Sequence, residues 1–162
     1  KKQWQGEKSH KVGAQFEKVI HSLFRHSQVF EVSTNVRSTA AELDIVFSLK
    51  NSAMKVPFLH GRTHLLGEGK CYESAPKSEW FNELLGLLQT HGTDLAFIFV
   101  YHKPKKVDRE CRSTIAIGVG GRKFVVPFGT TQFAKVRDGR PVLEVMHKQF
   151  VDCANHSTEL CV

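Results

Sequence analysis

The chain has 162 residues, of which 41% are hydrophobic and 24% are charged, and this excludes a largely disordered protein in favour of one globular domain with its own core. Lysine and arginine outnumber aspartate and glutamate by 23 to 16, which gives a net charge of +7. Such a balance favours a partner of dense negative charge, such as nucleic acid or an anionic membrane surface, although a basic surface that serves solubility alone has the same composition.

The N-terminal half predicts a helix followed by a run of strands. Apolar residues recur at steps of three and four over residues 11–25, as on one face of an amphipathic helix. β-Branched and aromatic residues then predict strands over 28–37, 42–49 and 63–72, with a less certain strand at 56–59.

The C-terminal half predicts a helix over 78–91 and a strand over 95–101, whose unbroken apolar run is typical of a strand covered on both faces. Residues 102–113 are polar and basic and predict a loop or a short helix. Residues 114–128 predict a hairpin that turns at Gly120–Gly121, and a further helix is expected near 142–150. The expected fold is therefore α/β, a mixed sheet flanked by helices.

Composition also bears on the compartment. The four cysteines are Cys71, Cys111, Cys153 and Cys161, and their wide spacing predicts a reducing environment, cytoplasmic or nuclear, and not a secreted disulfide scaffold. No apolar run reaches about 18 residues, so we expect no membrane partner. The N-terminus has neither a signal peptide nor an initiator Met, so one expectation is that the chain was cut from a longer protein.

Three charged residues interrupt strands that are otherwise apolar. The two-residue period of a strand places Glu68 and Lys70 on one face of 63–72, and in the strand 42–49 Asp44 interrupts the apolar residues on either side of it. If the two strands are neighbours, Asp44 and Glu68 converge, and a divalent cation such as Mg²⁺ relieves their repulsion. Lys70 can then orient the attacking water or stabilise charge on a phosphate. The alternative for Glu68 and Lys70 is a solvent-exposed charge pair on an edge strand.

The pattern Leu43-Asp44 followed by Glu68-Gly69-Lys70 resembles the PD-(D/E)xK nuclease superfamily, with Leu43 in place of the proline. Gly13-Ala14-Gln15-Phe16-Glu17 resembles the opening helix of its restriction-endonuclease-like members, including the Mrr type and some Holliday-junction resolvases. The resemblance implies an αβββαβ core over about residues 11–101. It does not extend to residues 102–162, which we expect to form a C-terminal hairpin and helix extension of the same single domain. It also implies that Glu17 assists the metal, although a glutamate on an amphipathic helix more commonly faces solvent.

The function expected from this resemblance is a Mg²⁺-dependent DNA endonuclease, with Mn²⁺ able to substitute, from a restriction, defence or recombination protein. The catalytic residues would be Asp44, Glu68, Lys70 and Glu17. Enzymes of this superfamily often act as homodimers. Candidate contacts to the nucleic-acid backbone are Lys103, Lys105, Lys106, Arg109, Arg122 and Lys123. A solvated basic loop is an equal explanation for these cations. The alternative function is a non-catalytic nucleic-acid-binding module that retains a nuclease fold, and RNA is an open alternative to DNA.

Overall fold

The computed structural model describes residues 2–37, 42–71, 76–101 and 109–155. Its five strands form one sheet, and their order across the sheet is also their order along the chain. β1 to β3 pair antiparallel, and β3 to β5 pair parallel. The sheet is therefore mixed, as predicted. The strands are β1 (Phe30–Arg37), β2 (Glu42–Leu49), β3 (His64–Cys71), β4 (Leu95–Tyr101) and β5 (Phe124–Phe128).

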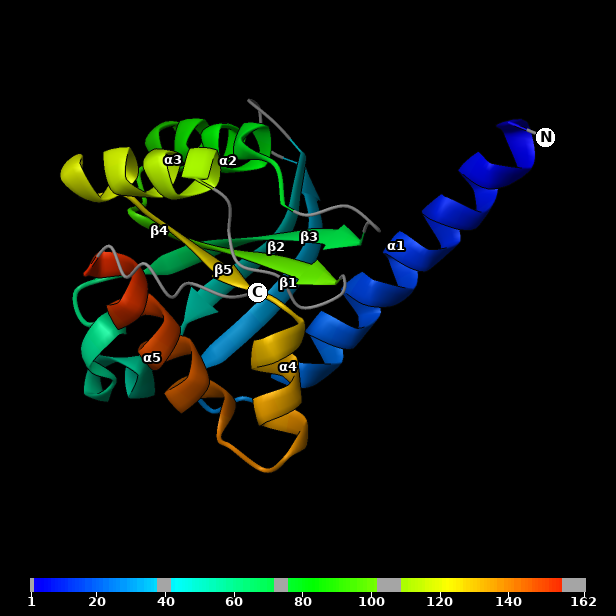
Figure 1. Cartoon of the computed structure of the whole chain (residues 1–162). Helices are drawn as coiled ribbons and strands as arrows, with labels where there is room; N and C mark the ends of the chain where they lie inside the picture. The colour runs from blue at the N-terminus through cyan, green and yellow to red at the C-terminus, as the bar shows by residue number, and fades with distance from the viewer. Residues whose placement is uncertain (1, 38–41, 72–75, 102–108, 156–162) are drawn as a thin grey trace.

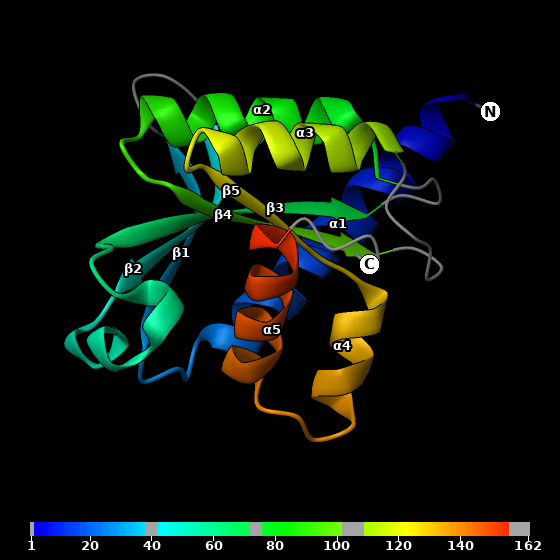
Figure 2. The ribbon, with the colours of Figure 1, turned by 60° about the vertical axis from the view of Figure 1, so that its left-hand side comes forward.

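Helices flank the sheet on both faces (Figure 1). The parallel strands require crossover connections, and these place α2 and α3 side by side on one face, while α1, α4 and α5 lie on the other (Figure 2). The predicted α/β class, with a mixed sheet between helices, is confirmed. The helices are α1 (Lys2–Phe24), α2 (Ser78–Thr90), α3 (Arg109–Gly120), α4 (Thr130–Arg137) and α5 (Val142–Ala154).

The core lies between the sheet and these helices. β4 is buried from Leu95 to Val100, as the unbroken apolar run predicted, because helices cover both of its faces. On the α1 face, Phe24 lies edge-on to Phe47 of β2 with ring centroids 5.1 Å apart, and Phe99 of β4 adjoins both rings. This aromatic contact fixes α1 across β2, β3 and β4.

The predicted hairpin over 114–128 is wrong. Residues 109–120 form α3, and β5 pairs parallel to β4 and not with a neighbouring hairpin arm. The buried positions Cys111, Ile115 and Gly118 recur at helical steps, which the β-branched residues between them obscured. A Cβ atom added to Gly118 would lie 2.8 Å from Leu85 of α2, so this glycine permits close helix packing and does not form a hairpin turn.

The less certain strand at 56–59 is also wrong. Two short 3-10 helices, η1 (Asn51–Lys55) and η2 (Pro57–Leu59), connect β2 to β3. Pro57 is the first residue of η2, where its missing N–H leaves no partner unsatisfied. Phe58 and Leu59 are buried although they do not belong to a strand. The apolar residues of this segment therefore indicated burial and not a strand. Within the described ranges, no helix combines the length and the apolar character needed to cross a membrane.

Candidate active site

The candidate site lies where β2 and β3 part. Their antiparallel pairing runs from Ser48–His64 to Ile45–Gly67, so among the described residues the ladder ends just before Asp44 and Glu68. Continuing this register by one residue places Asp44 opposite Glu68. β3 remains paired with β4 on its other side as far as Cys71. The two acids therefore lie where β2 and β3 stop pairing and a split opens in the sheet. Both strands remain paired with their other neighbours.

Asp44 occupies the split itself. Its Oδ2 accepts a hydrogen bond from the backbone N–H of Gly69, at 3.1 Å between nitrogen and oxygen. A side-chain oxygen thus satisfies a β3 donor beyond the last pair of the β2–β3 ladder. This bond positions the carboxylate next to both neighbours of Gly69, namely Glu68 and Lys70.

Glu68 and Lys70 form an ion pair that is largely shielded from water. Their side chains are 14% and 16% exposed, so they are not the solvent-exposed edge pair that the sequence left as an alternative. Burial, and then the negative charge of Asp44, raises the pKa of Glu68 to about 7 in spite of the opposing influence of Lys70. Glu68 is therefore an acid whose charge is poorly compensated by the protein alone.

The ammonium of Lys70 is surrounded by acids. Burial is the largest single influence and would lower its pKa, but the hydrogen bond and charge of Glu68, together with the charges of Glu83 and Asp44, outweigh burial. The net result is a pKa above the ordinary lysine value. Lys70 is consequently a fixed cation beside the two carboxylates at neutral pH.

Glu17 reaches the same place from α1. A methyl group on Gly69 would lie 3.6 Å from Cγ of Glu17 and 3.9 Å from Oδ2 of Asp44, so both side chains adjoin one point of β3. Burial and the charge of Asp44 raise the pKa of Glu17, while a hydrogen bond with Asn35 lowers it. Glu17 is half-buried and does not belong to a purely solvated helix face. Asp44 thus adjoins Glu68 and Lys70 of β3 and also Glu17 of α1.

The chemistry of this cluster suits a divalent cation. Mg²⁺ commonly takes one or two carboxylates, with water and phosphate oxygens completing its coordination. Burial, and then the charge of Asp44, raises the pKa of Glu68 to about 7, and a cation would relieve the repulsion between the two carboxylates. Among the described residues, however, no group of three or more His, Cys, Asp or Glu side chains is arranged to hold a metal ion. Asp44 and Glu68 are therefore a two-carboxylate candidate, with Glu17 adjacent.

The predicted phosphate contacts are scattered. Lys103, Lys105 and Lys106 lie outside the described residues. Arg109 is exposed at the start of α3, which follows the end of β4 where Tyr101 pairs with Cys71. Because α3 runs back to the start of β5, Arg122 and Lys123 lie at the opposite end of the sheet, away from the carboxylates.

Lys123 also has a structural role that the sequence did not suggest. Its Nζ donates to the backbone oxygens of Thr93, at 2.8 Å, and Leu88, at 3.5 Å, near the C-terminus of α2. Arg122 is exposed, with a backbone φ of +55° that follows the end of α3. A phosphate contact from either residue stays a prediction, and the ammonium of Lys123 is already engaged within the fold.

Sequence reasoning missed two residues of the cluster, Asn35 and Glu83. Asn35 is hydrogen-bonded to Glu17, and Glu83 of α2 contributes its charge to Lys70. Asparagine is depleted in strands, so its presence within a predicted strand was a usable signal. Glu83 carried no signal, because an acid on an exposed helix position is ordinary.

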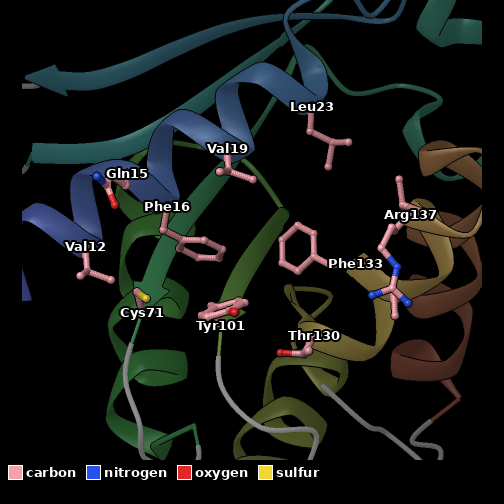
Figure 3. A pocket seen from close by; sticks show the side chains of 12 residues that line it. Val12, Gln15, Phe16, Val19, Leu23, Cys71, Tyr101, Thr130, Phe133 and Arg137 are labelled. Carbon is pink, nitrogen blue, oxygen red and sulfur yellow. The ribbon is translucent and has the colours of Figure 1, made fainter.

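An apolar groove of about 690 Å³ lies between α1 and α4 on the other side of β3 (Figure 3). Phe16, Tyr101 and Phe133 point into it, and Arg137 stands at one end. Cys71 contributes from β3, whereas its neighbour Lys70 faces α2. None of the described carboxylates of the cluster lines the groove, so it is separate from the candidate site.

Comparison with known proteins adds no family assignment. No protein-family model matches the chain, and no curated protein matches it significantly.

Proposed function

We propose that the chain is a metal-dependent DNA endonuclease with a restriction-endonuclease-like core. The observation that carries this proposal is the juxtaposition of Asp44 and Glu68 at the split between β2 and β3, with Lys70 paired to Glu68. Two neighbouring carboxylates beside an amine, in a place shielded from water, are unusual in a purely structural sheet. Each of these charges is costly to bury alone. A site for phosphodiester hydrolysis accounts for all three residues.

Asp44 and Glu68 are the proposed ligands of Mg²⁺ or Mn²⁺. The bound cation would act as a Lewis acid towards the phosphate and lower the pKa of a coordinated water. Asp44 is held in place by the N–H of Gly69, and Glu68 by its strand and by Lys70. Glu17 adjoins Asp44 and is proposed as an auxiliary acid that acts directly or through a water molecule.

Lys70 is the proposed charge-stabilising residue. Its ammonium remains protonated at neutral pH because acids surround it. If Glu68 shared its charge with a bound cation, Lys70 would be available to orient the attacking water or to stabilise the negative charge that develops on the phosphate. Its burial matters, since an electrostatic contact is stronger where water is excluded.

The proposed substrate is DNA. The net charge of +7 favours a polyanion, and the exposed Arg109 lies at the end of the sheet towards which β3 carries Glu68 and Lys70. Phosphate contacts of this kind give affinity without sequence preference. The geometry of the carboxylates is equally suited to RNA, so the substrate assay includes both polymers.

The test is a cleavage assay on supercoiled plasmid and on structured RNA, with Mg²⁺, with Mn²⁺ and with EDTA. We expect metal-dependent nicking of plasmid that is abolished in Asp44→Asn and in Lys70→Met. Matched controls are Asp138→Asn and Lys148→Met, whose side chains are largely exposed and lie outside the cluster. These controls should cleave as the wild type does, because they remove the same charge from elsewhere on the surface.

A non-catalytic nucleic-acid-binding module is the second candidate. The ion pair between Lys70 and Glu68 favours it, because the same contact could simply stabilise the fold. This alternative predicts a shift of DNA in gels that is unaffected by Asp44→Asn, with no cleavage in either metal. Cleavage lost in Asp44→Asn but retained in Asp138→Asn would exclude it.

A further inference from the structure

Asn35 has a backbone conformation that is foreign to a strand. It lies within β1, yet its φ is +52°, in the left-handed region that side chains other than glycine rarely enter. The pairs Thr34–Ile45 and Val36–Leu43 flank it, so the register places Asn35 directly opposite Asp44. The irregularity of β1 therefore coincides with the candidate site.

The side chain of Asn35 is redirected towards α1. In a regular antiparallel pair, residues directly opposite each other project from the same face of the sheet, so Asn35 would share the face of Asp44. Asn35 instead hydrogen-bonds Glu17, which belongs to the helix that covers the other face. Among residues with a side chain, asparagine tolerates the left-handed conformation best, and it also supplies an amide donor.

Glu17 needs such a donor because its surroundings are otherwise unfavourable to a charged carboxylate. It is half-buried, it adjoins Asp44 beside Gly69, and both burial and the charge of Asp44 oppose its ionisation. A hydrogen bond from an amide stabilises the charged form and fixes its direction. A glycine would satisfy the backbone at position 35 with less strain, but it could not provide this bond.

We propose that Asn35 is a positioning residue, which holds the Glu17 carboxylate beside Asp44 so that Glu17 can assist the bound cation. This inference rests on the proposed nuclease function, and it assigns the strained segment of β1 to the metal site. Groups that orient metal ligands typically change metal affinity by about 10- to 100-fold when they are removed. The contribution of Asn35 should therefore be measurable as an affinity that depends on Glu17.

The test is a titration with Mn²⁺ alone, followed by electron paramagnetic resonance, on four proteins: the wild type, Asn35→Gly, Glu17→Gln and the double variant. Asn35→Gly should weaken Mn²⁺ binding about 10-fold or more. Its resistance to urea should equal or exceed that of the wild type, because glycine adopts a positive φ without strain. In the Glu17→Gln background the same substitution should leave the affinity unchanged. Asn51→Gly, at the exposed start of η1, is the matched control and should bind Mn²⁺ normally.

Each failure has its own signature. Wild-type affinity in Asn35→Gly, or an equal loss in the Glu17→Gln background, would overturn the positioning role. If the wild type binds Mn²⁺ and cleaves DNA in either case, the proposed nuclease function stands and only the role of Asn35 is wrong. A wild type that neither binds Mn²⁺ nor cleaves refutes the nuclease function itself, and the role of Asn35 with it.

Discussion

Replacing Glu68 by glutamine should remove a pH-dependent loss of stability from the metal-free protein. The pKa of Glu68 is raised from 4.5 to about 7, first by burial and then by the charge of Asp44. The folded state therefore binds more protons than the unfolded state between pH 4.5 and about 7, and the free energy of unfolding falls as pH rises through this window. Glutamine has nearly the same shape and remains neutral, so it should escape this loss.

The magnitude follows from the size of the shift. A rise from 4.5 to about 7 corresponds to roughly 3 kcal/mol, at about 1.36 kcal/mol for each pKa unit. The Glu68 side chain is only 14% exposed, so screening by water does not remove this effect. Glu68→Gln and the wild type should have similar free energies of unfolding near pH 4, and Glu68→Gln should be the more stable protein near pH 8.

Urea unfolding in EDTA at intervals between pH 4 and pH 8 measures this difference. The pKa of Glu17 is also raised, but Glu17 is present in both proteins, so the difference between the two curves reports on position 68. Adding Mg²⁺ at pH 8 should raise the stability of the wild type more than that of Glu68→Gln, since binding to the folded state stabilises it. A difference that stays constant across the pH range would show that Glu68 is not held as a buried, poorly compensated acid.

Four further substitutions test side-chain packing, backbone strain and a hydrogen-bonded lysine in the fold. Gly67→Ala should lower the free energy of unfolding by about 1–3 kcal/mol in urea, because its methyl group would lie 2.8 Å from the ring of Phe47. Gly86→Ala, on the exposed side of α2 with open space around it, should instead raise the free energy of unfolding by about 0.5–1 kcal/mol, and equal effects of the two alanines would refute this account. Arg122→Gly should raise the melting temperature, because glycine relieves a positive φ at the end of α3, and an unchanged or lower value would contradict the strain. Lys123→Met should lower the free energy of unfolding by about 1 kcal/mol, since its bonds to carbonyl oxygens near the end of α2 are lost, and unchanged stability would leave phosphate binding as its role.

Local periodicity predicted much of the candidate site. The alternation of a strand placed Glu68 and Lys70 on one face, and the lone acid among apolar neighbours singled out Asp44. Both inferences need only the side-chain period of two, and the structure brings these residues together. The unbroken apolar run of β4 also predicted its place in the sheet correctly. A strand that is covered on both faces needs no polar residues on either face.

The missed features depend on tertiary contacts. Residues 114–120 are rich in β-branched side chains and glycine, yet they are helical because Gly118 lets α3 pack against Leu85. Propensity is a weak guide where packing decides in this way. The positive φ of Asn35 accompanies its hydrogen bond with Glu17 on a distant helix, and a one-residue irregularity leaves the local pattern of a strand unchanged.

The most direct test of the central claim is a crystal soaked in Mn²⁺ and measured at a wavelength where manganese scatters anomalously. The account predicts an anomalous peak about 2 Å from a carboxylate oxygen of both Asp44 and Glu68, with the ammonium of Lys70 close by. Absence of this peak at a Mn²⁺ concentration that supports nucleases, or a peak bound by neither acid, would contradict it.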